Sequence, residues 1–146
     1  MNKSALLFPG QGSQFIGMGL ELYDAYDIAK DVFKEVDDSI NFSLTKLMNH
    51  GDLEELTMTV NAQPAIMAVS IAVFRVLSKN LNLDVLSNVA SFAAGHSLGE
   101  YSALCGVGAF SLSQTSKLLK TRGEAMQNSV PYGAGGMLAL VNTDES

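Results

Sequence analysis

The sequence is poor in cysteine, in charged residues and in long apolar runs. Cys105 is the single cysteine among 146 residues, so the chain can form neither an intrachain disulfide nor a CxxC zinc site. One cysteine is typical of a reducing compartment, and we expect a cytoplasmic protein. We also expect no bound metal, because the scattered methionines fit core packing and neither acidic pair, at 37–38 or 54–55, has the glycine and spacing of a calcium loop.

Positive charge is also scarce, with 9 Lys and Arg against 15 Asp and Glu and a formal net charge of −6. This balance argues against nucleic acid or an anionic membrane surface as a partner. The longest apolar stretch, residues 64–77, is interrupted by Ser70 and Arg75 and is shorter than the ~20 residues of a membrane span. We therefore expect a buried helix there, in a protein whose 47% hydrophobic residues fold around a core.

The spacing of apolar residues predicts an α/β protein. Expected strands lie at 4–8, 89–94 and 137–141, and expected helices at about 19–38, 42–48, 61–79, 98–107 and 111–126, with an acidic turn at 52–56 and a linker at 131–136. Asn61 and Pro64 suit a helix start, and Ser111 with Gln114 forms a capping box. Three strands are fewer than the ~5–6 of a typical sheet, so we expect further strands from residues outside this chain.

Residues 95–99 read GHSLG, a GxSxG pattern between an expected strand and an expected helix. Flanking glycines permit a sharp turn that holds the serine hydroxyl clear of the backbone. Ser97 is therefore a candidate nucleophile, and the amide of Leu98 a candidate oxyanion donor. The alternative is a tight strand-to-helix turn without chemistry.

A glycine-rich loop, residues 10–14, follows the first expected strand. It does not fit a phosphate-binding loop, because Met18 and Gly19 stand where lysine and serine or threonine are required, and Phe15 replaces the third glycine of a dinucleotide-binding pattern. The amide of Gln11 could instead supply the second oxyanion donor of a serine acyl-transfer site.

Together these motifs resemble the malonyl-CoA:acyl carrier protein transacylases and the related acyltransferase domains of fatty acid and polyketide synthases. The resemblance covers the whole chain, and its motifs, in chain order, are FPGQGSQ at 8–14, NAQPA at 61–65, GHSLGEY at 95–101, RG at 122–123 with Met126, and GM at 136–137. It implies an α/β-hydrolase-like core at 1–128, followed at 129–146 by a linker and the start of an inserted ferredoxin-like small subdomain. The chain is then expected to be the N-terminal portion of that fold.

The resemblance implies that Ser97 takes malonyl from coenzyme A and passes it to the phosphopantetheine thiol of acyl carrier protein in fatty acid biosynthesis. Coenzyme A enters as a thioester substrate, and no cofactor is implied. The amides of Gln11 and Leu98 would form the oxyanion hole, Arg122 would hold the malonyl carboxylate, and Gln63 would line the pocket. A planar guanidinium can bind a carboxylate bidentately. From the residues alone, Arg122 could equally be a solvated helix residue.

The general base is the part of the site that these residues do not supply. His96 adjoins the nucleophile on a tight turn, where neighbouring side chains diverge, and His50 is expected at the surface. In the family the catalytic histidine lies well downstream of the serine, and we expect it to lie beyond residue 146. Two alternatives stay open: a serine hydrolase, and a non-catalytic fragment that binds coenzyme A or carrier protein.

Overall fold

Two parallel strands and seven helices make up the described part of the chain. The computed structural model describes residues 4–81, 90–130 and 134–135. The elements, in chain order, are β1 (Ala5–Phe8), α1 (Leu20–Ala25), α2 (Asp27–Ile40), α3 (Leu44–His50), α4 (Leu53–Thr57), α5 (Thr59–Leu81), β2 (Phe92–Gly95), α7 (Leu98–Gly106) and α8 (Leu112–Gln127). The predicted α/β class is confirmed, whereas the strand expected at 137–141 lies outside the described residues, as does the linker at 131–136 apart from residues 134 and 135.

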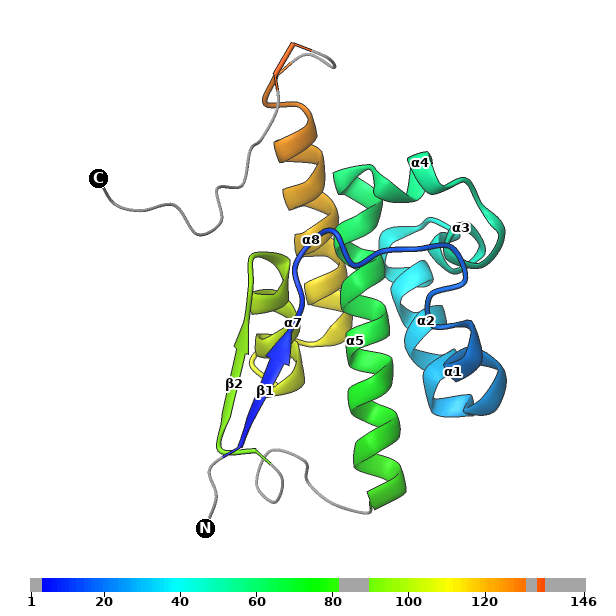
Figure 1. Ribbon diagram of the computed structural model, residues 1–146, viewed down its shortest axis with the longest axis vertical. Helices are drawn as coiled ribbons and strands as arrows, with labels where there is room; N and C mark the ends of the chain where they lie inside the picture. The colour runs from blue at the N-terminus through cyan, green and yellow to red at the C-terminus, as the bar shows by residue number, and fades with distance from the viewer. Residues whose placement is uncertain (1–3, 82–89, 131–133, 136–146) are drawn as a thin grey trace, which may run out of the picture.

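Helix α5 runs through the middle of the molecule, with the strands on one side and α1 and α2 on the other (Figure 1). It packs against α2, α7 and α8. The largest fully buried apolar side chains of this core are Phe33, Leu44, Met48, Leu56, Ile66, Met67, Ile71, Leu98, Leu112 and Leu119. By length and composition α5 could cross a membrane, but 61% of its apolar window is buried inside the protein. Its burial agrees with the predicted core helix.

The helix predicted at 19–38 is wrong as a single element, because Tyr26 interrupts it. Tyr26 is extended, with φ −135° and ψ 119°, and its N–H bonds the Leu22 carbonyl to close α1. Helix α1 has no buried residue, whereas α2 buries Ala29, Val32, Phe33 and Val36. The extended residue thus changes the direction of the chain. Helix α2 buries residues in the core, whereas Leu22 and Tyr23 of α1 pack against it only partly buried.

The predicted start of the long helix at Asn61 is also wrong. Helix α5 begins at Thr59, and the N–H groups of Asn61 and Ala62 both bond the Met58 carbonyl. The Asn61 side chain is buried and donates to the Glu55 carbonyl at 2.9 Å, so it ties α5 to α4 instead of capping a helix. Pro64 consequently lies inside the helix.

Local helix signals elsewhere are confirmed. Ser111 caps α8 through the predicted box, accepting from the N–H of Gln114 while the Gln114 side chain accepts from the N–H of Ser111. The acidic turn expected at 52–56 is the short helix α4, whose N-cap Asp52 accepts from two backbone N–H groups.

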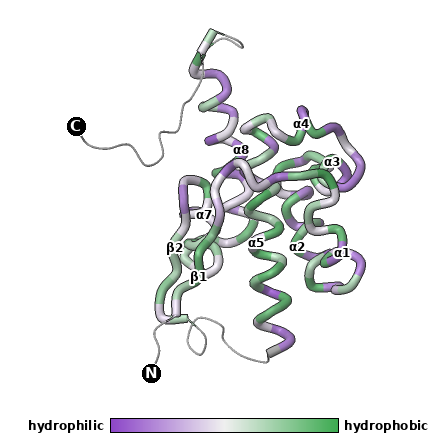
Figure 2. Tube along the Cα trace, in the orientation of Figure 1, coloured by the Kyte–Doolittle hydropathy of each residue, from purple (hydrophilic) through white to green (hydrophobic). Residues whose placement is uncertain are grey.

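One face of the two-stranded sheet is apolar and open. In the parallel register Ala5 pairs with Phe92 and Leu7 with Ala94, which places these four side chains on one face. Leu7 is 79% exposed and Phe92 is 58% exposed. Figure 2 shows the hydrophobic colouring of β1 and of much of α5. Parallel sheets normally have both faces covered, and the described residues cover one.

Candidate active site

Ser97 lies in the elbow, the sharp turn at residues 95–98 between β2 and α7. Strand β2 ends at Gly95, α7 begins at Leu98, and Ser97 is the N-cap between them with φ 56° and ψ −113°. A positive φ costs a non-glycine residue about 1–3 kcal/mol and is often found where a side chain must be presented for function. The Ser97 side chain is exposed, and the predicted strand–turn–helix context is confirmed.

The two glycines of the motif are sterically required. A Cβ atom on Gly95 would collide with the backbone of Gly99, and one on Gly99 would collide with the Phe8 carbonyl. The His96 N–H also bonds the Phe8 carbonyl, at 3.2 Å. The end of β1 and the start of α7 therefore lie in direct backbone contact, and the two loops that follow the strands meet beside Ser97.

Arg122 bonds both Ser97 and Gln63, a residue 59 positions away in sequence. Arg122 donates from Nη2 to Ser97 Oγ at 3.1 Å and from Nη1 to Gln63 Oε1 at 2.7 Å. Gln63 is fully buried on α5, whereas Arg122 on α8 is half-buried. Arg122 is hydrogen-bonded to Ser97 and to the buried Gln63 amide. It is therefore not a solvated helix residue, which was the alternative that the sequence left open.

The guanidinium of Arg122 carries a charge that no described carboxylate neutralises. Across residues 4–81 and 90–130 the ion pairs are Lys30–Asp27 and Arg75–Glu35, both remote in sequence from the elbow. A half-buried cation beside a nucleophile is suited to bind an anionic group of a substrate.

Two further residues contact the Arg122–Gln63 pair and were not singled out as site residues from the sequence. The Arg122 guanidinium carbon lies 5.8 Å from the centre of the Tyr101 ring, within cation–π range. Met126 accepts a hydrogen bond at its sulfur from Gln63 Nε2, at 3.4 Å. Their spacing held a signal, since Tyr101 is four residues after Ser97 on α7 and Met126 four after Arg122 on α8, which places each pair on one helix face.

The two amides expected at the oxyanion hole are available as donors. Leu98 is the first residue of α7, where backbone N–H groups lack helical partners. Neither the Leu98 N–H nor the Gln11 N–H donates a hydrogen bond to another described residue. The Gln11 side chain donates to Thr59 Oγ1 at 3.4 Å, which links the glycine loop to the start of α5.

Neither histidine of the chain bonds Ser97 within the described residues. His50 ends α3 and is exposed. His96 is also exposed and lies over the glycine loop, where a Cβ on Gly10 would be 2.5 Å from its Nδ1. No group of three or more His, Cys, Asp or Glu that could hold a metal occurs in the described ranges. Burial raises the pKa of the Cys105 thiol, which disfavours the reactive thiolate.

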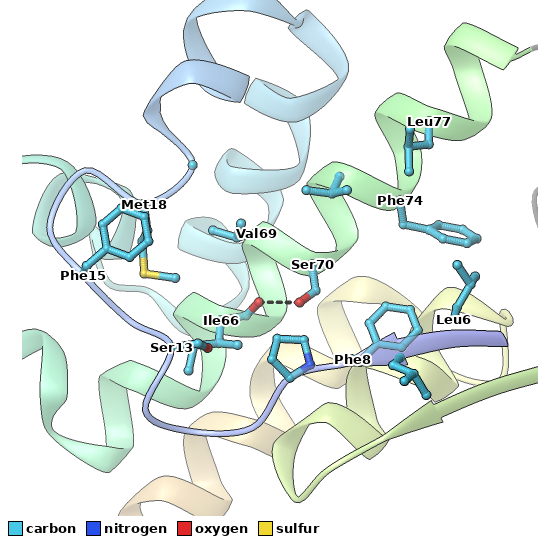
Figure 3. A pocket seen from close by; sticks show the side chains of 14 residues that line it. Leu6, Phe8, Ser13, Phe15, Met18, Ile66, Val69, Ser70, Phe74 and Leu77 are labelled. Carbon is cyan, nitrogen blue, oxygen red and sulfur yellow. Dashed lines mark hydrogen bonds between the residues drawn. The ribbon is translucent and has the colours of Figure 1, made fainter.

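An apolar cavity of about 370 Å³ lies apart from these residues, between β1, the following loop and α5. Figure 3 shows Leu6 and Phe8 of β1 facing Phe74 and Leu77 of α5 across it, with Phe15 at its far end. None of Ser97, Gln63 and Arg122 lines it. The cavity therefore lies between β1 and α5 and is not part of the candidate active site.

A sequence profile of the acyl transferase domain matches residues 5–146. A malonyl CoA-acyl carrier protein transacylase of Bacillus subtilis is 47% identical over 144 residues, which are 99% of this chain and 44% of that protein. Its namesake in Escherichia coli K12 is 36% identical over 146 residues, which are 100% of this chain and 46% of that protein. The chain thus spans less than half the length of these curated relatives.

Solved structures agree with the sequence relatives. The crystal structure of an acyl-carrier-protein-S-malonyltransferase from Bartonella henselae superposes with a TM-score of 0.85 at 52% identity, over 89% of this chain and 41% of that one. A malonyl-transacylase in complex with its type II polyketide synthase acyl-carrier protein superposes with a TM-score of 0.82 at 39% identity, over 90% and 41%. On the profile match, the relatives and the shared α/β fold, the chain belongs to the acyl transferase domain family.

Proposed function

We propose that the protein carrying this chain transfers a malonyl group from coenzyme A to the phosphopantetheine thiol of acyl carrier protein, through a malonyl ester on Ser97. Relatives in Bacillus subtilis and Escherichia coli bear the name malonyl CoA-acyl carrier protein transacylase. The proposal includes an α/β-hydrolase-like core, the start of a ferredoxin-like subdomain from residue 129, and action in the cytoplasm on coenzyme A thioesters without a cofactor.

In the first half of the reaction Ser97 Oγ attacks the thioester carbonyl carbon. The carbonyl oxygen gains negative charge, which the N–H groups of Leu98 and Gln11 stabilise by hydrogen bonds. The carbon–sulfur bond then breaks, and coenzyme A leaves as a thiol with the proton that Ser97 gave up. A general base must carry that proton, and we assign it to a histidine in the part of the fold that the longer relatives have beyond this match.

In the second half the carrier-protein thiol attacks the malonyl ester. The bond between the acyl carbon and Ser97 Oγ breaks, and the proton of the thiol returns to Ser97. The same two amides serve both halves, because each passes through a tetrahedral intermediate with its oxyanion in one place.

The observation that carries the proposal is the position of Arg122. In a malonyl ester the free carboxylate carbon is three bonds of about 1.5 Å from Oγ, so it must lie within about 4 Å of that atom. Arg122 Nη2 is 3.1 Å from Ser97 Oγ, and the guanidinium has no described carboxylate partner. A malonyl carboxylate can therefore replace the serine hydroxyl as the hydrogen-bond partner of Arg122, whereas an acetyl group has no carboxylate to bind there.

The test is acyl loading of Ser97 in the full-length protein, followed by intact mass spectrometry with malonyl-CoA or acetyl-CoA. Arg122→Ala should lower malonyl loading on the order of 10- to 100-fold, because charge-assisted hydrogen bonds contribute about 1.5–3 kcal/mol each, and should leave acetyl loading intact. Lys117→Ala is the matched control, since it removes one exposed positive charge from the same helix. Ser97→Ala should abolish both adducts.

Three outcomes count against the proposal. Equal loss of malonyl and acetyl loading in Arg122→Ala would show that the arginine supports the structure and does not bind the malonyl carboxylate. A malonyl adduct that reacts with water faster than with carrier protein would identify a serine hydrolase. An adduct that persists in Ser97→Ala would place the nucleophile elsewhere.

A further inference from the structure

The Gln63 side chain is a buried amide whose oxygen and N–H groups need hydrogen-bond partners within the protein. It is 0% exposed, so water cannot satisfy its oxygen or its N–H groups. Its Oε1 accepts from Arg122 Nη1 at 2.7 Å, and its Nε2 donates to Met126 Sδ at 3.4 Å. A buried polar group without a partner is costly, so both contacts matter for where this amide sits.

Arg122 fixes which way the amide faces. A guanidinium has only donors, so it bonds the oxygen of Gln63, and the reversed amide would set N–H against N–H. With the oxygen turned to Arg122, Nε2 must point the other way, and Met126 Sδ is its partner within the described residues. A thioether is a weak acceptor, but here it is the acceptor that lets the amide keep this orientation.

The helix geometry makes these contacts possible. Arg122 and Met126 are four residues apart on α8 and share one face, while Gln63 lies opposite them on α5. Gly123 allows the approach, because a Cβ there would be 2.6 Å from Val60 Cα. A continuous chain of hydrogen bonds therefore runs from the Met126 sulfur through Gln63 and Arg122 to Ser97.

We propose that Met126 is a positioning residue for the carboxylate clamp, which is the Arg122 guanidinium. Met126 acts through Gln63 to hold Arg122 beside Ser97. The inference rests on the proposed malonyl transfer and deepens it, since it assigns part of the selectivity for a carboxylate-bearing acyl group to a residue that need not touch substrate. Without the sulfur acceptor, Gln63 turns toward another partner and releases Arg122 Nη1. The clamp then loses its fixed geometry while the elbow and its oxyanion amides stay in place.

The experiment compares Met126→Leu with Met126→Gln in the full-length protein. Leucine keeps the volume and removes the acceptor, whereas glutamine restores an oxygen acceptor on a side chain of similar length. In steady-state transfer to carrier protein, Met126→Leu should raise the KM for malonyl-CoA about tenfold, and acetyl transfer should change less than about twofold. Met126→Gln should recover most of the malonyl value. Met58→Leu, a partly exposed methionine at the end of α4, is the matched control.

A double-mutant cycle with Gln63→Leu separates positioning from packing. Once Gln63 lacks its amide, Met126→Leu should add no further loss of malonyl selectivity. Full additivity of the two losses would overturn the proposal, as would equal losses for malonyl and acetyl or no loss for either. Arg122→Ala in the same assay distinguishes failure of the proposed malonyl transfer from failure of the proposed role of Met126. If it leaves malonyl preference unchanged, the proposed function fails; if it abolishes the preference but Met126→Leu does not weaken it, only the role of Met126 fails.

Discussion

At Gly123, helix α8 lies directly against the backbone of α5, and Gly123→Ala should disturb both stability and the site. A Cβ there would be 2.6 Å from Val60 Cα and 2.9 Å from the Thr59 carbonyl oxygen. Carbon atoms pack at about 3.5–4.0 Å, so the helices must separate by about 1 Å. Overpacking of this kind costs about 1–3 kcal/mol, and alanine returns about 1 kcal/mol of helix propensity. We expect a net loss of about 1 kcal/mol in the free energy of unfolding.

The same displacement acts on the neighbouring clamp. The bond from Arg122 Nη1 to Gln63 Oε1 is 2.7 Å long, and a shift of about 1 Å takes it beyond hydrogen-bond range. In Gly123→Ala, the urea midpoint of unfolding and the malonyl loading of Ser97 should therefore both fall, while acetyl loading is preserved. Thr121→Ala, an exposed position on α8, is the control. A Gly123→Ala protein with unchanged stability and unchanged malonyl loading would refute the close-contact argument.

Two predictions concern stability away from the site. Burial raises the pKa of the Asp37 carboxyl, against an opposing hydrogen bond from the Thr45 N–H. The folded state therefore binds the carboxyl proton more tightly than the unfolded state does. Protonated Asp37 stabilises the fold at low pH, and this stabilisation is lost as pH rises from 3.8 through the raised pKa. Asp37→Asn, which keeps an oxygen for Thr45, should be more stable than the parent protein at neutral pH and lose that advantage below pH 3.8; urea midpoints that differ equally at both pH values would contradict this. Ser111→Ala should lower stability by about 1 kcal/mol through loss of the α8 cap, with Ser113→Ala as control, and an unchanged urea midpoint would show that the cap is dispensable.

The elements that could be predicted from the sequence are those set by neighbouring residues. The strand, turn and helix around Ser97 follow from two glycines that leave room for backbone contacts, and the α8 cap follows from a hydroxyl three residues before a glutamine. The break at Tyr26 could not be predicted this way. It depends on how deeply each helix packs in the folded core, because α2 buries four residues and α1 none, while apolar residues at helical spacing occur on both sides of Tyr26.

Contacts within the site depend on tertiary structure to different degrees. Resemblance to a family pointed to Arg122 and Gln63, but their meeting requires α5 and α8 to pack closely across 59 residues of sequence. The resemblance included Met126, and its spacing placed it on one helix face with Arg122, but a hydrogen bond to its sulfur could not be predicted because methionine usually fills apolar space. Its contact with the buried Gln63 amide exists only because α5 and α8 pack together.

Leu7 and Phe92 stand on a sheet face that no described residue shields. A newly synthesised chain in which only this region has folded will present that face to its surroundings, and chaperones that bind aliphatic and aromatic side chains will compete there with self-association. Since burying one such side chain fully contributes about 1.5–3 kcal/mol, the yield of native protein will depend on how soon this face is covered after it leaves the ribosome.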